Sequence, residues 1–327
     1  MKALVLTDTK VLTYKDAPDA LAGEGEVLVR IAHSGICGSD MHAFLGHDAR
    51  RPTPLILGHE ASGTIEGGPR DGERVTINPQ VSCGTCRDCT SGRTNICATR
   101  QIISIPPREG AFAELVAIPE THVVEVPEGV SLRAAALTEP LACGWHGVRL
   151  GLTALPEARG DIRALVLGGG AIGVGAALAL RAQGVTQIEV VEPNPIRAER
   201  LTAHPEFSTT VEATTPGSYQ LVIDAVGYAA TRAAASTAAR QGGFIVHIGL
   251  GEDTGGLDIR RMTLQEIGFT GTYAYTFQDF KDTAQAIFEG QFGALDWVEV
   301  RALADGQSAF DDIRNGRVAA PKIILEP

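Results

Sequence analysis

Short apolar runs, separated by polar and glycine-containing stretches, fill the first part of the chain. They occur at Ala3–Thr7, Val27–Ala32, Ala61–Ile65 and Arg74–Ile77, and Ala111–Ile118 returns to the same pattern. Runs of this length, bounded by turn-forming residues, are typical of β-strands. We therefore predict a β-rich amino-terminal part with a loop-rich, irregular segment between residues 35 and 60.

The pattern changes near residue 164, where predicted strands begin to alternate with helices. Ala164–Leu167 and Gln187–Val191 are strand candidates, and Val174–Gln183 between them is a helix candidate that stops at Gly184. Later elements follow the same alternation: strands at Leu221–Val226, Gly243–Ile248 and Ile267–Tyr273, an alanine-rich helix at Ala229–Gln241, helices at Phe277–Glu289 and Ser308–Asn315, and a last strand at Lys322–Leu325. This alternation predicts βαβ units and a parallel sheet.

Composition narrows the choice of function. The 327 residues are long enough for two domains, and the formal charge of −11 without a basic run argues against nucleic acid and anionic membranes as partners. The start of the chain has no cleavable signal, and no run of about 18 apolar residues suggests a membrane span. We expect a cytoplasmic protein, in which cysteines grouped between Cys83 and Cys97 favour metal over disulfides.

The segment from residue 35 to residue 60 gathers groups that bind metals or carry protons. Cys37 lies on one loop, and His59 is followed by Glu60 on another. Thiolate and imidazole suit Zn²⁺, and a carboxylate can complete a site that keeps one position for water or substrate. Because proton-carrying groups such as Ser39 are close by, we predict a catalytic zinc rather than a buried free thiol and a core histidine.

A second metal motif has the spacing C-x₂-C-x₂-C-x₇-C. Its members are Cys83, Cys86, Cys89 and Cys97. Four thiolates can enclose one Zn²⁺ at about 2.3 Å per bond without an open position, so we predict a structural zinc that helps this lobe to fold. The alternatives are unrelated thiols, two disulfides, or a zinc finger that binds nucleic acid, which the acidic total and the lack of a basic recognition helix disfavour.

A glycine-rich turn follows the strand candidate Ala164–Leu167. Gly168, Gly170 and Gly173 give the pattern G-x-G-x-x-G, with Ala171 and Ile172 inside it. The glycines let the backbone approach a pyrophosphate, whose charge meets the amino terminus of the following helix. With a strand on each side, this turn predicts a dinucleotide-binding site.

An acidic residue ends the next strand and bears on the choice of dinucleotide. Glu192 can accept hydrogen bonds from both ribose hydroxyls and should repel a 2′-phosphate, so we expect NAD rather than NADP. Arg197 and Arg200 follow closely. They could lean toward a phosphate, or they could simply form a solvated helix face.

Together these motifs resemble the zinc-dependent medium-chain dehydrogenases, the family of alcohol, sorbitol and threonine dehydrogenases. The most specific parts are Gly35-Ile-Cys-Gly-Ser-Asp40, Gly58-His-Glu60, the four-cysteine lobe and the glycine turn. The resemblance covers nearly the whole chain in the same order. Within the family, Glu139-Pro140-Leu141 resembles the sorbitol or polyol branch, since alcohol-dehydrogenase relatives more often have a cysteine ligand there.

The resemblance implies an α/β fold in which a GroES-like β-barrel catalytic domain accompanies a Rossmann coenzyme domain with a doubly wound parallel sheet. The expected boundaries are 1–140 for the catalytic domain with its lobe at 83–97, 141–275 for the Rossmann domain, and 276–327 for a return to the catalytic domain. It also implies a homodimer or homotetramer, with the strand near Ile267–Tyr273 as a plausible contact.

The resemblance also implies roles for individual residues. Cys37 and His59 would bind the catalytic zinc, Glu60 would be a ligand or near-ligand, and Glu139 would bind directly or through the zinc-bound water. The other implied roles are acceptance of the substrate proton by Ser39, a later relay step by His42, and orientation of His59 by Asp40. From its position at a helix entrance alone, Glu139 would be read as a helix-capping acid.

The implied reaction oxidises a secondary alcohol, a polyol or sugar alcohol, to the ketone. Zinc acidifies the hydroxyl, and the resulting alkoxide passes hydride to the nicotinamide of NAD⁺. Because Cys37, Glu60 and Glu139 would all add negative charge, we expect that they do not all coordinate at once. The alternatives are a threonine or simple-alcohol dehydrogenase, a non-catalytic NAD-binding zinc protein, and a zinc-free reductase of the same superfamily.

Some features depart from the family pattern or leave the substrate open. The hairpin at Gly67–Arg74 is shorter than is usual in relatives. Leu201–Tyr219 is also shorter, and there we expect a reduced or irregular third Rossmann strand. Arg50 and Arg51 would suit an acidic or phosphorylated sugar alcohol, but we expect a solvated pair of loop charges.

Overall fold

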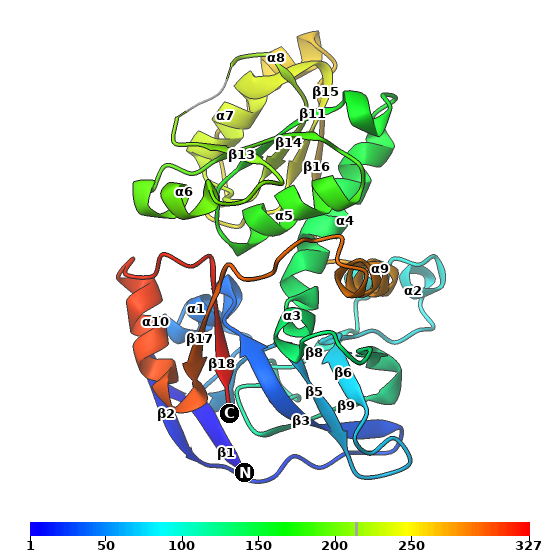
Figure 1. Ribbon diagram of the computed structural model, residues 1–327, viewed down its shortest axis with the longest axis vertical. Helices are drawn as coiled ribbons and strands as arrows, with labels where there is room; N and C mark the ends of the chain where they lie inside the picture. Colours follow the sequence, from blue (N-terminus) through cyan, green and yellow to red (C-terminus); the bar gives the residue numbers. More distant parts are fainter. Residues whose placement is uncertain (213–214) are drawn as a thin grey trace. The chain divides into compact units, whose positions relative to one another are not determined.

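The computed structural model describes residues 1–212 and 215–327, which form two compact units (Figure 1). The first unit contains Met1–Glu139, Thr276–Glu289 and Leu295–Pro327, and the second contains Pro140–Tyr275 and Gly290–Ala294. Residues 213–214, which belong to the segment predicted to be shortened, lie outside the described residues.

The first unit is built on sheets that are largely antiparallel. Its main sheet has the order β10-β6-β5-β3-β18-β17, and β9 also pairs with β3. These strands are β3 (Glu26–Gly35), β5 (Glu60–Glu66), β6 (Arg74–Ile77), β9 (Leu115–Pro119), β10 (Val123–Glu125), β17 (Val298–Ala302) and β18 (Lys322–Glu326). A second sheet orders β2 (Val11–Asp16), β1 (Lys2–Asp8) and β4 (Leu55–Ile56), and a third pairs β7 (Gln80–Val81) with β8 (Gln101–Ile102).

Short helices join these strands. They are α1 (Gly38–Phe44), α2 (Arg87–Thr90), η1 (Thr94–Ile96), η2 (Glu120–His122), α3 (Leu132–Ala136), α9 (Phe277–Phe288), η4 (Leu303–Asp305) and α10 (Gly306–Arg314). Helix α4 (Thr138–Ala154) begins in the first unit and continues into the second.

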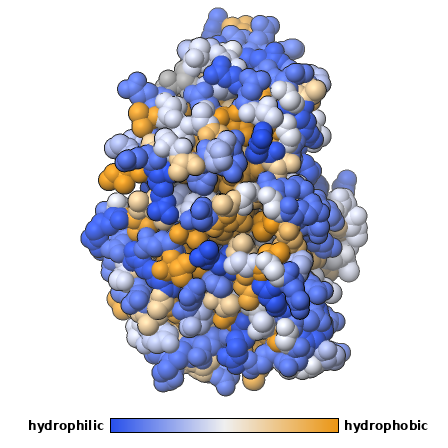
Figure 2. Space-filling model, viewed as in Figure 1, coloured by the Kyte–Doolittle hydropathy of each residue, from blue (hydrophilic) through white to orange (hydrophobic). Residues whose placement is uncertain are grey.

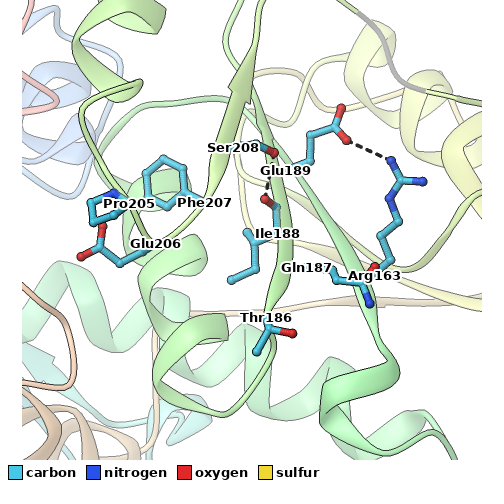
Figure 3. A pocket seen from close by; sticks show the side chains of 9 residues that line it. All are labelled: Arg163, Thr186, Gln187, Ile188, Glu189, Pro205, Glu206, Phe207 and Ser208. Atoms are coloured by element: carbon cyan, nitrogen blue, oxygen red, sulfur yellow. Dashed lines mark hydrogen bonds and ion pairs between the residues drawn. The ribbon is translucent and has the colours of Figure 1, made fainter.

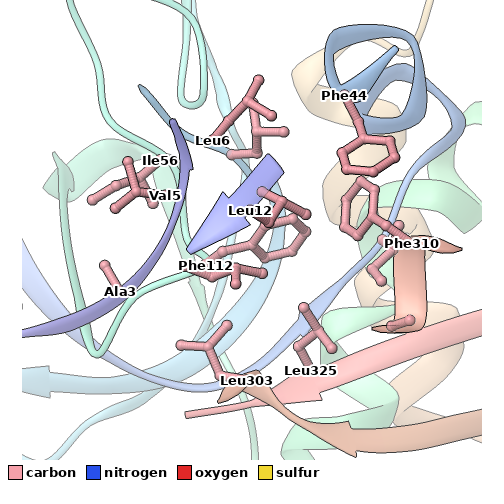
Figure 4. Close-up of a cluster of buried hydrophobic side chains, with 14 of the residues drawn as sticks. Ala3, Val5, Leu6, Leu12, Phe44, Ile56, Phe112, Leu303, Phe310 and Leu325 are labelled. Atoms are coloured by element: carbon pink, nitrogen blue, oxygen red, sulfur yellow. The ribbon is translucent and has the colours of Figure 1, made fainter. Parts of the chain in front are cut away.

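A buried hydrophobic cluster packs α1 and α10 against the three-stranded sheet β2-β1-β4 (Figure 4). The ring of Phe310 lies 5.1 Å from that of Phe44 and 6.1 Å from that of Phe112, measured between centroids. All three rings are fully buried, and burial of one such side chain stabilises the fold by roughly 1.5–3 kcal/mol. The loop after β3 is thereby anchored at the end of α1, close to the predicted metal ligands.

The second unit contains a six-stranded parallel sheet in the order β13-β12-β11-β14-β15-β16. The strands are β11 (Arg163–Leu167), β12 (Gln187–Val191), β13 (Ser208–Thr210), β14 (Tyr219–Asp224), β15 (Ala239–His247) and β16 (Gly268–Gly271), and the connecting helices include η3 (Arg159–Asp161), α5 (Ala171–Ala182), α6 (Pro195–Leu201), α7 (Ala229–Ala238) and α8 (Ile259–Leu264). This order is that of the doubly wound Rossmann fold. The α/β class and the predicted Rossmann unit are thus confirmed, and the reduced third strand is the three-residue β13.

Several predicted boundaries are wrong. The helix expected over Ala229–Gln241 ends at Ala238, because β15 starts at Ala239. Only the end of Ala111–Ile118 is strand, as β9 starts at Leu115. The segment from 35 to 60 was predicted to be irregular, yet it contains α1, whose start is stabilised when the Asp40 carboxylate accepts the backbone N–H of Cys37.

The face of the molecule drawn in Figure 2 is mainly polar. Figure 2 shows mostly hydrophilic residues on the face that it draws, with smaller hydrophobic areas between them, in keeping with 20% charged residues. Among the helices of the described residues, none has both the length and the apolar composition that crossing a bilayer requires.

Candidate active site

Strand pairing brings the predicted ligands of the catalytic metal together. In the antiparallel pair β3–β5, Gly35 lies opposite Glu60, and in the pair β18–β3, Ile324 lies opposite Gly35. Cys37 follows the end of β3, and His59 immediately precedes β5. As a result, one possible ligand atom from each of Cys37, His59 and Glu60 lies within 4.8 Å of the other two.

His59 is buried and is held at one ring nitrogen by Asp40. The Asp40 Oδ1 atom lies 3.3 Å from His59 Nδ1, and Asp40 Oδ2 accepts the backbone N–H of Cys37 at 3.0 Å. Burial alone would lower the pKa of His59, but Asp40 and Cys37 raise it well above 6.5. With Nδ1 turned to a carboxylate, Nε2 is left for a metal, as is usual for metal-binding histidines.

Glu60 is tied at one oxygen and open at the other. Lys322 Nζ donates to Glu60 Oε1 at 2.6 Å and to the carbonyl oxygen of Ile36 at 2.9 Å. Burial opposes the charge on Lys322, yet Glu60, Cys37 and Glu139 together raise its pKa above the usual 10.5. Among the described residues, Glu60 Oε2 has no hydrogen-bond partner although it is buried. A metal ion would give that oxygen the partner that buried polar atoms normally have.

Glu139 lies in the first turn of α4 and is 7% exposed. Its charge acts on Lys322 and helps to raise the pKa of that ammonium group. However, its carboxylate is not part of the cluster formed by Cys37, His59 and Glu60. The role of Glu139 as a direct or water-mediated ligand therefore stays a prediction.

The two predicted relay residues lie on α1. Ser39 Oγ is 3.5 Å from His59 Nε2, which is the nitrogen left for a metal. His42 is exposed three residues later, and its ring centroid lies 6.5 Å from that of His47. The structure brings Ser39 to the ligand cluster and His42 to the surface, and proton transfer between them stays a prediction.

Arg51 is buried, and the expectation that it is a solvated loop charge is wrong. Its side chain is 3% exposed and donates to the carbonyl oxygens of Ser39 and Ser104, each at 2.9 Å, and to Ser104 Oγ at 3.2 Å. A further 3.2 Å contact pairs it with Asp48. Since Ser104 Oγ lies 3.4 Å from His59 Nδ1, Arg51 fixes the residues on both sides of the imidazole.

Sequence reasoning missed the roles of Lys322, Arg51 and Ser104. Ser104 carries no motif. Lys322 did offer a signal, because it adjoins the apolar run Ile323–Leu325, and a charged residue beside a buried strand requires a charged partner. Arg50, by contrast, is 60% exposed and pairs with Asp48, as expected for a loop charge.

The cluster at Cys37 fits a zinc ion. Bonds of about 2.0–2.3 Å from sulfur, nitrogen and oxygen place ligand atoms roughly 3–4 Å apart, which the observed limit of 4.8 Å allows. The donors are a thiol, an imidazole whose far nitrogen is held by Asp40, and a buried carboxylate with an open oxygen. This donor set, with a hydroxyl beside it, is typical of catalytic rather than closed structural sites.

The four-cysteine lobe fits a closed zinc site. Cys97 Sγ lies 3.5 Å and Cys89 Sγ 3.9 Å from Cys83 Sγ, and tetrahedral zinc–sulfur bonds of about 2.3 Å place sulfurs about 3.8 Å apart. Backbone N–H groups of Thr85 and Cys86 lower the pKa of Cys83 to about 5. These cysteines are free, and the sulfur separations of 3.5 and 3.9 Å suit a shared metal ion rather than disulfide bonds of about 2.05 Å.

The glycine turn joins β11 to α5. Gly168 has φ of +98°, and a Cβ atom on Gly173 would lie 1.7 Å from the carbonyl oxygen of Gly168. Both positions therefore require glycine, because larger residues would strain or block the turn. Gly170 caps the amino terminus of α5, where backbone N–H groups can meet a phosphate.

Glu192 lies beside this turn and is 3% exposed. Its Oε2 atom accepts the N–H of Gly169 at 2.9 Å and pairs with Arg197 at 3.1 Å, while Oε1 accepts the N–H of Asn194 at 2.9 Å. The acid and the turn thus meet at the carboxyl ends of neighbouring parallel strands, where α/β proteins bind nucleotides.

A cavity of about 430 Å³ opens elsewhere in the Rossmann unit (Figure 3). It is lined by Arg163, Thr186, Gln187, Ile188, Glu189, Pro205, Glu206, Phe207 and Ser208. Thr186 precedes β12 and residues 187–189 form its amino-terminal part, whereas Glu192 follows its carboxyl end. None of the predicted cofactor residues lines this cavity, so it is separate from the glycine turn.

Both units match known protein families. Residues 23–128 match the family of alcohol dehydrogenase GroES-like domains, and residues 171–289 match the family of zinc-binding dehydrogenases. A probable D-xylulose reductase A from Arthroderma otae is 30% identical over 96% of this chain and 94% of that protein. L-galactonate-5-dehydrogenase from Escherichia coli is 31% identical over 90% of this chain and 89% of that protein.

Solved structures share the architecture over nearly the full length. An oxidoreductase of unknown specificity from Escherichia coli aligns with a TM-score of 0.90 and 25% identity, covering 99% of this chain and 98% of that chain. A putative zinc-binding dehydrogenase from Sinorhizobium meliloti, bound to NADP, aligns with a TM-score of 0.88 and 27% identity over 100% and 99%. This chain is an oxidoreductase and belongs to the zinc-dependent medium-chain dehydrogenase family of alcohol and polyol dehydrogenases.

Proposed function

We propose that this chain oxidises a secondary alcohol, a polyol or sugar alcohol, to the ketone with NAD⁺ as the hydride acceptor. The observation that carries the proposal is the buried cluster of Cys37, His59 and Glu60, with an open carboxylate oxygen and the Ser39 hydroxyl beside it. A polyol is favoured by Glu139 at a position where alcohol dehydrogenases more often have cysteine. The names of relatives agree, since they refer to xylulose, galactonate and sorbitol.

Two zinc ions would be held, one by Cys37 and His59 with carboxylate help and one by the four cysteines of residues 83–97. When bound at Cys37, zinc would supply the Lewis acidity that lowers the pKa of a substrate hydroxyl. Asp40 keeps the His59 ring turned so that Nε2 faces this position. Glu60 supplies a carboxylate that either joins the ligand set or remains just outside it.

The proton and the hydride leave the alcohol by different routes. Ser39 Oγ, beside His59 Nε2, accepts the hydroxyl proton, and the exposed imidazole of His42 passes it to solvent. NAD⁺, held by the glycine turn and Glu192, would supply the acceptor for the hydride of the carbinol carbon. The products are the ketone, NADH and one proton, so atoms and charge balance.

The glycine turn and Glu192 would bind the dinucleotide, with NAD preferred over NADP. Glu192→Ser should remove the charge that repels a 2′-phosphate and release Arg197 to bind it. We expect the kcat/KM ratio of NADP to NAD to rise at least about tenfold, since one lost charge repulsion amounts to roughly 1.4 kcal/mol. Arg200→Ala on the same helix is the matched control, and an unchanged ratio in Glu192→Ser would contradict the role of Glu192.

The decisive experiment combines metal analysis with a substrate screen. We expect two zinc ions per chain and NAD⁺ reduction with C4–C6 polyols in preference to simple alcohols, threonine and sugar phosphates. A preference for simple alcohols or threonine would overturn the polyol assignment alone. Full zinc and NADH binding without turnover of any of these compounds would favour a non-catalytic NAD-binding zinc protein.

A further inference from the structure

A buried arginine joins the two loops that follow β14 and β15 in the second unit. We call residues 225–228 the β14 loop and residues 249–256 the β15 loop. Arg232 lies in the first turn of α7 and is 6% exposed. Its hydrogen bonds go to backbone carbonyl oxygens, those of Gly227 at 2.8 Å, Glu252 at 3.0 Å, Gly255 at 2.6 Å and Thr254. One buried guanidinium group, whose N–H groups need partners, therefore binds both loops.

The two loops also pack backbone against backbone. The N–H of Gly251 donates to the carbonyl oxygen of Val226 at 3.1 Å, and the N–H of Glu252 donates to that of Gly227 at 2.9 Å. A Cβ atom on Gly227 would lie 2.3 Å from the carbonyl carbon of Gly249, so no side chain fits between the loops. These contacts require one fixed separation of the loops, which the bonds from the arginine maintain.

The β14 loop in turn contacts the glycine turn. The N–H of Ala225 donates at 3.1 Å to the carbonyl oxygen of Leu167, the residue before Gly168. A Cβ atom on Gly168 would lie 2.4 Å from Val226 Cγ2, so the valine side chain rests against that glycine. A shift of the β15 loop would therefore pass through the β14 loop to the turn at which a pyrophosphate would bind.

We propose that Arg232 is a positioning residue for the dinucleotide: it holds the β15 loop against the β14 loop and so keeps Val226 and the glycine turn in the arrangement that binds the cofactor. The inference deepens the proposed function and rests on its assignment of the dinucleotide to the glycine turn. The turn and both loops follow the carboxyl ends of parallel strands, the edge where α/β proteins bind nucleotides.

Arg261 supplies a matched control. It also donates to backbone carbonyl oxygens of the second unit, those of Ser236 at 2.7 Å and Ala239 at 2.8 Å. These lie at the opposite end of α7, where the chain enters the amino end of β15. Substitution of Arg261 should therefore lower stability without disturbing the edge of the sheet that would bind the cofactor.

The test measures NADH affinity by fluorescence titration, amide hydrogen exchange and urea unfolding of the full-length protein. The variants are Arg232→Gln, Arg232→Lys, Arg261→Gln and Arg261→Lys. We expect Arg232→Gln to raise the Kd for NADH about tenfold, because binding must then order loops that the arginine holds in place beforehand. Without cofactor, amides of both loops should exchange faster in this variant than in the wild type.

The conservative variant should retain part of the effect. Lysine keeps the charge but lacks the planar fork that binds several carbonyl oxygens, so Arg232→Lys should raise the Kd about threefold. Both Arg261 variants should lose stability with an unchanged Kd and unchanged exchange of the two loops. A wild-type Kd in Arg232→Gln, or an equal rise in Arg261→Gln, would overturn the inference. If Arg232→Gln does not fold, Arg232→Lys decides.

Failure of the proposed function gives a different result. If the wild type binds NADH and Arg232→Gln weakens it as expected, but no alcohol is oxidised, the inference stands and the proposed reaction is wrong. If the wild type binds neither NADH nor NADPH, the dinucleotide site itself is wrong, and both the proposed function and this inference fall.

Discussion

The sulfurs of residues 83–97 come from one continuous segment, whereas the ligands at Cys37 meet only where β3 pairs with β5. The lobe uses thiols alone, supported by nearby backbone N–H groups. The cluster at Cys37 uses three kinds of donor and is surrounded by buried charges, among them Asp40 and Lys322. The four-cysteine site is thus built from one local segment, whereas the cluster at Cys37 is assembled by the pairing of strands that are distant in the sequence.

This difference explains what each site can do. A set of four thiolates leaves no open position and serves folding. A mixed set on separate strands can keep a position for substrate, and it can be tuned by side chains from distant parts of the chain. Substitutions at the Cys37 site should therefore reduce turnover, whereas substitutions in the lobe should reduce the stability of the fold.

Loss of the Cys37 sulfur should have the largest effect on turnover. Cys37→Ala removes a ligand of the metal that acidifies the substrate, so we expect activity to fall by roughly 10³-fold or more, equivalent to about 4 kcal/mol of transition-state stabilisation. Metal analysis should find the zinc of the lobe retained. NADH binding, measured by fluorescence, should not change, because the glycine turn lies in the other unit. Retained turnover would refute the assigned chemistry.

Loss of a sulfur from the lobe should act mainly on stability. Cys97 is fully buried, and Cys97→Ser should release the structural zinc and lower the free energy of unfolding by about 4 kcal/mol, as losses of bound metals do. Thermal unfolding and zinc content measure the two effects. Below the new melting temperature, the metal at Cys37 should remain, and its simultaneous loss would mean that the two sites are not independent.

Asp40→Asn tests whether the two metal sites are independent, because Asp40 supports a ligand at the Cys37 site alone. The amide cannot hold the His59 ring as the carboxylate does at 3.3 Å, so affinity for the metal at Cys37 should fall about 10–100-fold. Competition with a chelator measures it. The lobe provides an internal control in the same molecule, because Asp40 contributes nothing to it. Equal weakening of both sites would point to general unfolding instead.

The local site was easier to predict than the one built by the sheet. Spacing alone identifies Cys83 to Cys97 as a metal motif, because the ligands lie on one short segment. The glycine turn was accessible for the same reason, since Gly168, Gly173 and Glu192 belong to consecutive elements. The two units themselves follow from the switch between short strands and βα alternation.

Apart from Asp40, the supporting residues of the Cys37 site could not be assigned to it from the sequence, even though the position of Lys322 beside an apolar run indicated a buried charge in need of a partner. Lys322 meets Glu60 through the pairing of β18 with β3, and no pattern links positions so far apart. Arg51 looked like one of two equivalent loop charges. Only the fold turns it inward toward Ser39 and Ser104, while Arg50 stays at the surface.

The smallest effect should come from Arg51→Lys, with Arg50→Lys as its matched control. Lysine keeps the charge of Arg51 but cannot bind Ser39, Ser104 and Asp48 together, because it lacks the planar fork of arginine. The loss of one or two of these hydrogen bonds should cost about 1–2 kcal/mol of stability and lower kcat about three- to tenfold through the displaced Ser39 hydroxyl.

The same substitution at position 50 should change neither quantity, since that side chain is 60% exposed and its ion pair is weak in water. Urea unfolding and steady-state kinetics compare the two variants directly. If Arg51→Lys lowered stability with kcat unchanged, the arginine would brace the loop without positioning Ser39. If both variants behaved alike, burial of Arg51 would have no consequence for the site, and the network around His59 would be looser than its hydrogen bonds indicate.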